Sequence, residues 1–259
     1  MPIVEVAAHE QVGDQLFSLT FTAPIRLAEG GYQPGQFLHI RVSDSFDFLL
    51  RRPLSLCKVD LLRNHLTVVY RAQGVGTRRL SSVRVGESID VLGPLGRGFP
   101  IHAEDRRVLL VGGGIGVPPL VELARQLNGK GKQAVAVVGF QTCAQALLIA
   151  DLAEYGDVTV MSDDGSIGVR GLVTEALTAA FCQTFDRYYA CGPTPMLRAL
   201  QSVMRERRVP GYLSLEERMG CGIGLCVGCV HPVLRAGVVK NVKTCREGPV
   251  FAAEEVVFA

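Results

Sequence analysis

The chain has 259 residues, and 48% of them are hydrophobic, which is enough for about two domains with sizeable cores. Its 27 lysines and arginines are balanced by 25 acidic residues, so a nucleic-acid partner is not expected. Eight cysteines without a secretion signal favour a metal site in a reducing compartment over a disulfide framework.

The sequence indicates neither export nor a membrane span. The first ten residues have no basic start and no apolar stretch of the kind found in signal peptides. The longest run without charge, 133–150, contains three glutamines and divides into a strand and the start of a helix, so it does not predict a membrane span. We therefore expect a cytoplasmic protein with no membrane partner.

The first hundred residues contain several short runs in which apolar and polar side chains alternate. These runs cover 17–21, 38–42, 66–71 and 88–92, and glycine and proline turns separate them. Alternation with a period of two is typical of half-buried strands. Short strands with such turns predict a small antiparallel barrel over residues 1–100.

Two motifs in this barrel have side chains suited to a phosphate-containing ligand. In Arg51-Arg-Pro-Leu-Ser-Leu56 an arginine can clamp a pyrophosphate and a serine hydroxyl can bond the edge of a flavin ring. In Gly74-Val-Gly-Thr-Arg-Arg-Leu80 glycines precede the start of a helix, whose free N–H groups suit a phosphate. The alternatives are a solvated strand end for the arginines and an ordinary turn for the glycines.

The order of these motifs resembles the FAD-binding domain of the ferredoxin–NADP⁺ reductase superfamily. The usual signature there is Arg-x-Tyr/Phe-Ser/Thr, and Leu54 stands where the aromatic residue often lies, so a stacked aromatic ring is not implied at that position. The resemblance implies FAD as a cofactor. The residues it assigns to the flavin and its phosphates are Arg52, Pro53, Leu54, Ser55, Val69, Tyr70, Arg71, Gly76 and Thr77.

Residues 101–210 change to an alternation of buried strands and amphipathic helices, which predicts a doubly wound parallel sheet. The expected strands cover 107–111, 133–138, 158–160 and 187–190, and the expected helices cover 118–127, 145–155, 172–181 and 194–207.

The glycine-rich turn Gly112-Gly-Gly-Ile-Gly116 joins the first strand of this region to its first helix, where phosphates and dinucleotides bind. Val117 replaces the third glycine of the Rossmann fingerprint, so a simple tight turn remains an alternative. Cys191-Gly-Pro-Thr-Pro-Met196 follows a later strand and resembles the Cys-Gly-Pro motif of the same superfamily, which implies a nicotinamide site. The predicted NAD-binding residues are Gly112, Gly113, Gly114, Gly116, Cys191, Gly192 and Pro193.

The charges near the expected ribose site favour NADH over NADPH. A 2′-phosphate is usually bound by arginines at the end of the second strand, and 139–143 contains no basic residue. Asp163 and Asp164, after the third strand, would repel such a phosphate if they lay near it.

The most specific motif is Cys221-x4-Cys226-x2-Cys229, which Cys245 completes after fifteen further residues. Four thiolates at this spacing are the plant-type ligand pattern of a [2Fe–2S] cluster. The interleaved glycines allow a short loop to wrap a cluster and to direct N–H groups at its sulfurs. A zinc site usually takes two short cysteine pairs, into which this spacing does not divide. A zinc knuckle or four structural cysteines remain alternatives.

The rest of the last segment, 211–259, is expected to support this motif. A final sheet strand over 212–216 leads into the cysteine loop, and a hairpin turning at 235–237 separates the third and fourth cysteines. The charged run 216–218 could touch the nicotinamide or be solvated, and we favour solvation.

The order of a flavin barrel, a nucleotide domain and a segment ending in Cys245-Arg-Glu-Gly-Pro-Val-Phe251 resembles the electron-transfer subunits of NAD-dependent, heteromeric dihydroorotate dehydrogenases. The resemblance spans essentially the whole chain. It implies an FMN-containing catalytic partner, in a heterotetramer of two copies of each chain. It also implies that electrons pass from that partner's FMN through the [2Fe–2S] cluster and FAD to NAD⁺, in pyrimidine biosynthesis.

A flavin is needed in such a chain because NAD exchanges two electrons as hydride, whereas an iron–sulfur cluster takes one at a time. The sequence offers no general-base constellation, so we expect no catalytic residue for substrate oxidation in this chain. Two other functions stay open. One is a self-contained NAD(P)H:acceptor reductase, or a subunit of a bifurcating transhydrogenase or sulfide dehydrogenase; the other is a non-redox protein with structural zinc.

Overall fold

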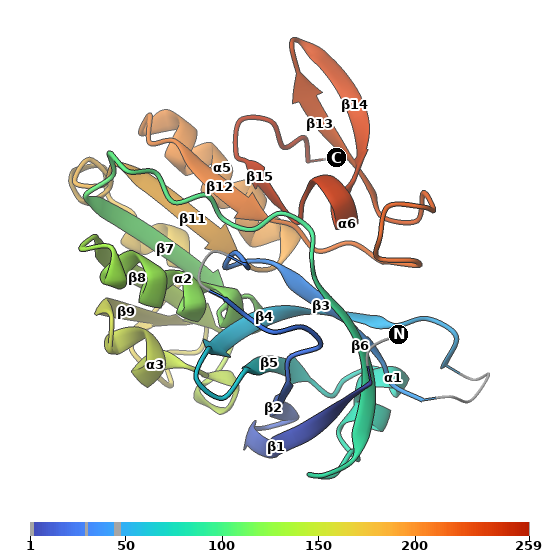
Figure 1. Ribbon diagram of the computed structural model, residues 1–259. Helices are drawn as coiled ribbons and strands as arrows, with labels where there is room; N and C mark the ends of the chain where they lie inside the picture. The colour runs from blue at the N-terminus through green and yellow to red at the C-terminus, as the bar shows by residue number, and fades with distance from the viewer. Residues whose placement is uncertain (1–2, 29–30, 44–47, 259) are drawn as a thin grey trace.

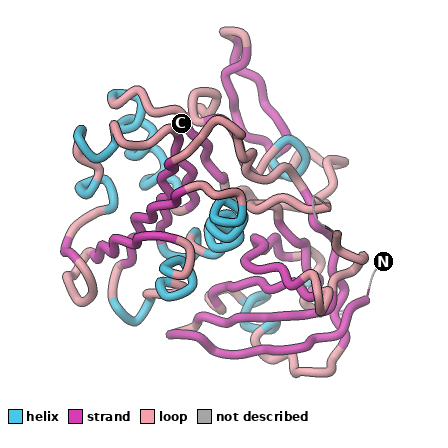
Figure 2. The backbone as a smooth tube through the Cα atoms, turned by 60° about the vertical axis from the view of Figure 1, so that its left-hand side comes forward, coloured by secondary structure: helices cyan, strands magenta, loops and turns pink. Residues whose placement is uncertain are grey.

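The computed structural model describes residues 3–28, 31–43 and 48–258. A closed antiparallel barrel lies beside a seven-stranded sheet, and a short hairpin projects from the far end of that sheet (Figure 1). Figure 2 shows most of the helices gathered around the larger sheet. The predicted architecture of a barrel, a parallel-sheet domain and a small C-terminal segment is confirmed. No helix in the described ranges is long and apolar enough to cross a membrane.

The barrel forms because alternate side chains of its strands are apolar and share one interior, which includes Leu19, Phe21, Leu38 and Ile40. Its strands in spatial order are β1 (Ile3–Gly13), β2 (Leu16–Thr22), β5 (His65–Arg71), β4 (Arg52–Asp60), β3 (Phe37–Arg41) and β6 (Ser88–Leu95). The short helix α1 (Val75–Leu80) follows β5.

Strand β3 departs from the simple alternation that its sequence suggests. Phe37 and His39 lie on the face opposite to Leu38 and Ile40, yet all of them are buried. The outer face is covered because Phe37 packs against cysteines of the C-terminal segment and His39 lies against Gly222. The barrel therefore supports the cysteine-rich loop directly.

The larger sheet carries six parallel strands and one antiparallel edge strand. In spatial order they are β10 (Val169–Arg170), β9 (Gly156–Ser162), β8 (Gln133–Phe140), β7 (Arg107–Gly113), β11 (Arg187–Cys191), β12 (Gly211–Ser214) and β15 (Val250–Ala252). The helices and single 3-10 turns between them are η2 (Gly114–Gly116), α2 (Pro118–Gly129), η3 (Cys143–Gln145), α3 (Ile149–Ala153), η4 (Val173–Ala176), α4 (Ala179–Cys182) and α5 (Thr194–Glu206).

Two predicted helices are wrong in extent. The helix expected over 145–155 is reduced to α3, because Leu147 is buried in the core and Leu148 takes a left-handed φ of 56°. The helix expected over 172–181 is divided into η4 and α4. Thr178 begins α4 by accepting the Phe181 amide on its side chain, and Leu177 before it is buried.

The C-terminal segment is attached to the sheet at both of its ends. β12 leads into the cysteine-rich loop, and the chain continues through β13 (Val230–Arg235), β14 (Val238–Lys243) and α6 (Thr244–Glu247) to β15, which pairs with β12. The predicted hairpin is present, and its turn contains Ala236 and Gly237 with positive φ.

One of the apolar clusters joins the barrel to the sheet. Leu16, Cys57 and Val69 of the barrel pack with the side chains of α2. A buried polar contact adds to this packing, since the Tyr32 hydroxyl donates to Glu122 Oε1 at 2.9 Å and Arg125 bonds both groups. The two parts therefore hold a fixed arrangement around the space between them.

Candidate functional site

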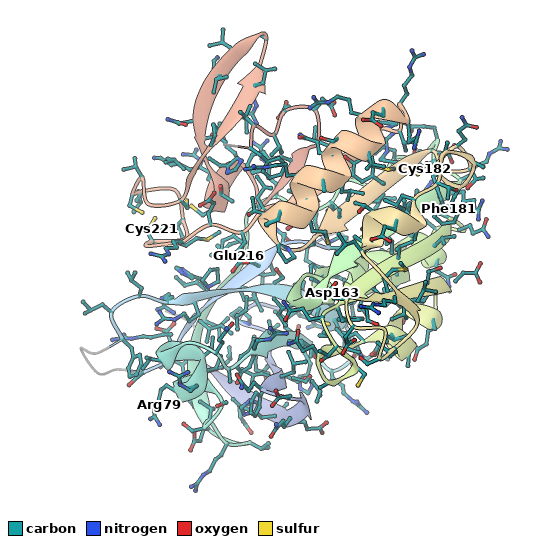
Figure 3. The ribbon with its side chains drawn as sticks, turned by 180° about the vertical axis from the view of Figure 1, so that it is seen from behind. Arg79, Asp163, Phe181, Cys182, Glu216 and Cys221 are labelled. Atoms are coloured by element: carbon teal, nitrogen blue, oxygen red, sulfur yellow. The ribbon has the colours of Figure 1, made fainter. Side chains whose placement is uncertain are left out.

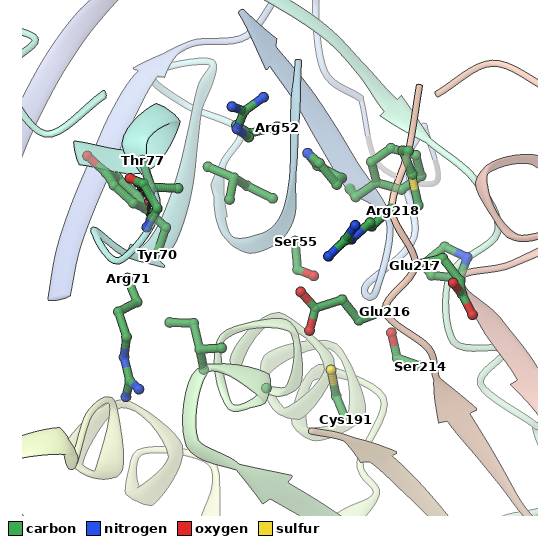
Figure 4. A pocket seen from close by; sticks show the side chains of 18 of the residues that line it. Arg52, Ser55, Tyr70, Arg71, Thr77, Cys191, Ser214, Glu216, Glu217 and Arg218 are labelled. Atoms are coloured by element: carbon green, nitrogen blue, oxygen red, sulfur yellow. Dashed lines mark hydrogen bonds between the residues drawn. The ribbon is translucent and has the colours of Figure 1, made fainter. Parts of the chain in front are cut away.

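A cleft of about 1060 Å³ lies between the barrel, the carboxyl edge of the sheet and the start of the cysteine-rich loop. Figure 4 shows side chains from all three parts facing it. The predicted residues that line it are Arg52, Pro53, Leu54, Ser55, Val69, Tyr70, Arg71, Gly76, Thr77, Gly113, Gly116, Cys191, Gly192 and Pro193. Of the predicted cofactor residues, only Gly112 and Gly114 do not line it.

The two barrel motifs meet at the cleft wall. A Cβ placed on Gly76 would lie 2.4 Å from Arg52 Nε, so the guanidinium of Arg52 lies directly on the Gly76 backbone. Arg51 also lines the cleft, but its guanidinium bonds Asp90 Oδ2 at 2.5 Å. The Thr77 hydroxyl is engaged in its own turn, where it accepts the Gly74 amide at 3.1 Å. Arg52 therefore offers a cation to a ligand from this wall, and Arg71 of the barrel lines the same cleft.

The glycine-rich turn and the Cys-Gly-Pro turn lie against each other at the edge of the sheet. A Cβ on Gly116 would approach the Cys191 carbonyl oxygen to 2.4 Å, and one on Gly113 would approach Met196 Sδ to 2.5 Å. Gly112 lies below the cleft against Val117 and Leu120. These glycines permit the close packing of two loops, a role that the sequence analysis did not consider beside phosphate binding and a simple tight turn.

Cys191 presents a neutral thiol to the cleft. Burial of its sulfur raises the pKa of Cys191 to about 12, and the hydroxyl of Ser214 opposes that rise by bonding the sulfur. A thiolate is therefore not available at this position near neutral pH.

Glu216 was not among the predicted cofactor residues, because solvation was the favoured reading of 216–218. It is exposed to solvent but lines the cleft, and Figure 4 shows its side chain directed into the space faced by Ser55 and Cys191. Its charge also raises the pKa of Cys191. The position of Glu216, two residues after β12, could have indicated this place in the cleft. The carboxyl ends of the strands meet at the ligand-binding edge of such a sheet.

The four predicted cysteine ligands lie in the C-terminal segment in two pairs. The Cys226 amide donates to Cys221 Sγ at 3.4 Å, and the Cys245 amide donates to Cys229 Sγ at 3.4 Å. Within the described residues, no three potential ligands converge as they would around a single ion. Figure 3 shows Cys221 at an edge of the molecule, and Cys229 and Cys245 are buried.

The electrostatics of the two pairs differ. Backbone amides, chiefly that of Cys226, lower the pKa of Cys221 to about 6, although burial opposes this. Burial and the neighbouring Cys229 raise the pKa of Cys245 to about 12. Coordinating thiols lose their protons, and the resulting thiolates need a positive charge nearby. A bound metal centre would supply that charge to this buried pair. Thiolates that accept backbone N–H bonds are the donor set of iron–sulfur sites.

The cleft and the cysteines share a common wall. Phe37 and Met219 line the cleft and also pack against Cys229 and Cys245. His39, on the same face of β3, lies against Gly222, where a Cβ would be 2.3 Å from its Nδ1. Burial lowers the pKa of His39 to about 4, so its ring is neutral under physiological conditions.

Comparison with known proteins follows the same division of the chain. Residues 3–99 match a model of the oxidoreductase FAD-binding domain, and residues 216–257 match the iron-sulfur cluster binding domain of dihydroorotate dehydrogenase B. A solved structure of an NADH-dependent reduced ferredoxin-NADP oxidoreductase superimposes with a TM-score of 0.86 at 30% identity, covering 98% of this chain and 89% of that one. Phthalate dioxygenase reductase shares the fold, with a TM-score of 0.65 at 19% identity over 94% of this chain and 93% of that one.

Curated relatives are similar over nearly their whole length. The protein from Geobacillus kaustophilus is 49% identical over 254 residues, which cover 97% of this chain and 96% of the relative. The one from Bacillus velezensis is 44% identical, with 97% and 96% of the two chains covered. Both carry the name dihydroorotate dehydrogenase B (NAD(+)), electron transfer subunit. The chain therefore belongs to the family of electron transfer subunits of dihydroorotate dehydrogenase B.

Proposed function

We propose that the chain carries electrons from a catalytic partner, which oxidises dihydroorotate to orotate for pyrimidine biosynthesis, through a [2Fe–2S] cluster and FAD to NAD⁺. The observation that carries this proposal is the wall formed by Phe37 and Met219. These two side chains line the cleft that would hold FAD and also contact two of the four cysteines. A single layer of side chains thus separates the two cofactor sites.

FAD fits the barrel side of the cleft. Arg52 supplies a fixed guanidinium for the pyrophosphate, and Ser55 supplies a hydroxyl for the edge of the flavin ring. When bound, FAD can accept a hydride and release electrons singly. The remaining predicted FAD residues line the same space and would contact the cofactor there.

A [2Fe–2S] cluster fits the cysteine-rich loop better than a single ion does. Its two irons each need a pair of thiolates, and the chain offers the pair Cys221 and Cys226 and the pair Cys229 and Cys245. The amides of this loop are directed at the sulfurs and would stabilise a negatively charged centre.

The sheet side of the cleft suits NADH. Gly113, Gly116 and Cys191 form its floor at the carboxyl ends of β7 and β11, with Gly192 and Pro193 beside them. The loop after β9 is bonded to the end of β8, because the Asp163 amide donates to the Phe140 carbonyl oxygen at 3.1 Å. The two aspartates therefore lie near the expected 2′-position, although the nearby Arg170 offsets the charge of Asp164 in part.

The catalytic partner would dock over the cysteine-rich loop. Ile223, Leu225 and Val227 are 49%, 79% and 70% exposed, so the loop presents apolar side chains next to the cluster ligands. Burying such a surface against another protein would bring that protein's FMN toward the cluster. We propose a heterotetramer of two copies of each chain.

A second candidate function is that of a subunit of an electron-bifurcating enzyme. It is supported by the structure that superimposes at 30% identity, which is described in terms of flavin-based electron bifurcation. A chain of that kind would serve a different partner. The identity of the partner therefore separates the two functions.

The test is a visible spectrum of the anaerobic chain, with and without the FMN-containing partner. We expect the flavin and iron–sulfur bands to bleach when NADH is added to the chain alone. Dihydroorotate should bleach them only when the partner is present. A chain that reduces a soluble ferredoxin with NADH and does not respond to the dihydroorotate-oxidising partner would overturn the proposal and favour the second function.

A further inference from the structure

The cysteine-rich loop, residues 220–229, is held from outside by a lysine. Lys243, the last residue of β14, donates from Nζ to the Gly224 carbonyl oxygen at 2.7 Å. The lysine also directly precedes α6, which carries Cys245, so its position along the chain is fixed relative to the buried cysteine pair. A cation is therefore bonded to the backbone of the loop that would wrap the cluster.

The residue that accepts this bond also donates to a cysteine sulfur. The Gly224 amide donates to Cys245 Sγ at 3.2 Å, so one residue is bonded both to the lysine and to a predicted cluster ligand. An ammonium bonded to a peptide oxygen polarises and restrains that part of the backbone. Lys243 thus acts on Cys245 Sγ through the backbone of a single residue.

The backbone at Gly224 has little freedom to rearrange. Its φ is +83°, and a Cβ there would lie 2.8 Å from Arg246 Cδ. The Gly224 amide donates to Cys245 Sγ at 3.2 Å. Gly224 is therefore held at its carbonyl by Lys243 and bonded through its amide to Cys245 Sγ.

We propose that Lys243 is a positioning residue that raises the reduction potential of the cluster by holding and polarising the backbone of Gly224, whose amide donates to Cys245 Sγ. The inference rests on the [2Fe–2S] cluster of the proposed function. Reduction adds negative charge to the cluster, so a nearby cation and stronger N–H donors favour the reduced form. Lys243 would in this way set how readily the cluster takes an electron relative to FAD.

The test compares Lys243→Gln with Lys240→Gln in the full chain loaded with FAD and cluster. Both substitutions remove one positive charge from β14, but only Lys243 is bonded to the loop. The cluster midpoint potential is measured by redox titration with electron paramagnetic resonance. We expect Lys243→Gln to lower the equilibrium constant for reduction of the cluster by roughly threefold to tenfold. This corresponds to a midpoint potential that is lower by roughly 30–59 mV for a one-electron step. Lys240→Gln and Lys243→Arg should stay near the parent value.

The outcomes separate this inference from the proposed function. Equal shifts in the two glutamine variants, or no shift in Lys243→Gln, would overturn the role of Lys243 and leave the cluster assignment intact. If Lys243→Gln lost its cluster, the Lys243→Arg variant would decide. A Lys243→Arg chain that keeps its cluster at the parent potential would support the role of Lys243, and loss of the cluster from both variants would overturn that role. A parent chain without a [2Fe–2S] signal would overturn both proposals.

Discussion

Gly116 and Gly224 lie in two glycine-rich loops of the same chain, one at the cleft and one at the cysteines. At Gly116 the space for a side chain is already taken, because a Cβ would lie 2.4 Å from the Cys191 carbonyl oxygen. At Gly224 the backbone has a φ of +83° and directs its amide at Cys245 Sγ. The cleft loop therefore depends on contact with its neighbour, and the cysteine loop depends on where its amides point.

This difference implies that the two loops can fail separately. A change in the cysteine loop should affect the cluster and leave the cleft able to bind FAD and NADH. A change in the cleft loop should disturb the fit between two turns of the sheet, and with it the binding of nucleotide. The four predictions below test this separation.

The largest effect is expected from Cys226→Ser, which removes one ligand of the exposed cysteine pair. Electron flow between FAD and the catalytic partner should be abolished, because the cluster loses a thiolate. NADH should still reduce FAD at a rate within about twofold of the parent, since Cys226 does not line the cleft. Rapid-mixing absorbance with NADH alone measures the FAD half-reaction. Loss of that half-reaction would contradict the separation of the two sites.

Gly116→Val should produce the converse defect. Its side chain would collide with the Cys191 backbone, which should lower the free energy of unfolding by roughly 1–3 kcal/mol, as overpacking does. NADH reduction of FAD should fall strongly while the chain keeps its iron and sulfide. Denaturant unfolding and metal analysis measure the two quantities. A matched control is Gly129→Val, where the added Cβ meets no atom within 4 Å beyond its own helix backbone and its chain neighbours. An equal defect in the control would refute the contact argument.

Arg52→Ala tests whether the arginine packed on Gly76 serves a ligand. The substitution should weaken FAD retention by roughly tenfold to a hundredfold, because a charge-assisted bond to a phosphate contributes about 1.5–3 kcal/mol. Equilibrium dialysis of FAD from the purified chain measures the change. Arg79→Ala provides a comparison, since this exposed arginine of α1 does not line the cleft. Unchanged FAD affinity in Arg52→Ala would remove Arg52 from the site.

The smallest effect concerns the choice of nucleotide. NADPH should bind about tenfold more weakly than NADH, which corresponds to about 1.4 kcal/mol, because Asp163 and Asp164 lie by the end of β8. Steady-state kinetics with each nucleotide measure the preference, and Asp163→Asn should reduce it. A parent chain that prefers NADPH would show that Arg170 outweighs the aspartates.

Features that depend on neighbouring residues in the chain could be predicted well. The alternation of side chains predicted the positions of four barrel strands, β2, β3, β5 and β6. The sequence also predicted the hairpin that separates the loop with three cysteines from Cys245. The helix expected over 145–155 was wrong because Leu147 enters a core built from other segments. His39 belongs to an alternating run that predicts a half-buried strand, yet it is buried by a loop far along the chain.

The sequence by itself determined the cysteine motif, the order of barrel and parallel sheet, and 14 of the 29 residues that line the cleft. Only the tertiary structure decided that Glu216 enters the cleft, that Phe37 and Met219 link it to the cysteines, and that Lys243 holds the Gly224 carbonyl. The reason is physical. Periodicity and spacing record the local geometry of one strand or loop, whereas these contacts join segments whose distance in space depends on the packing of the whole chain.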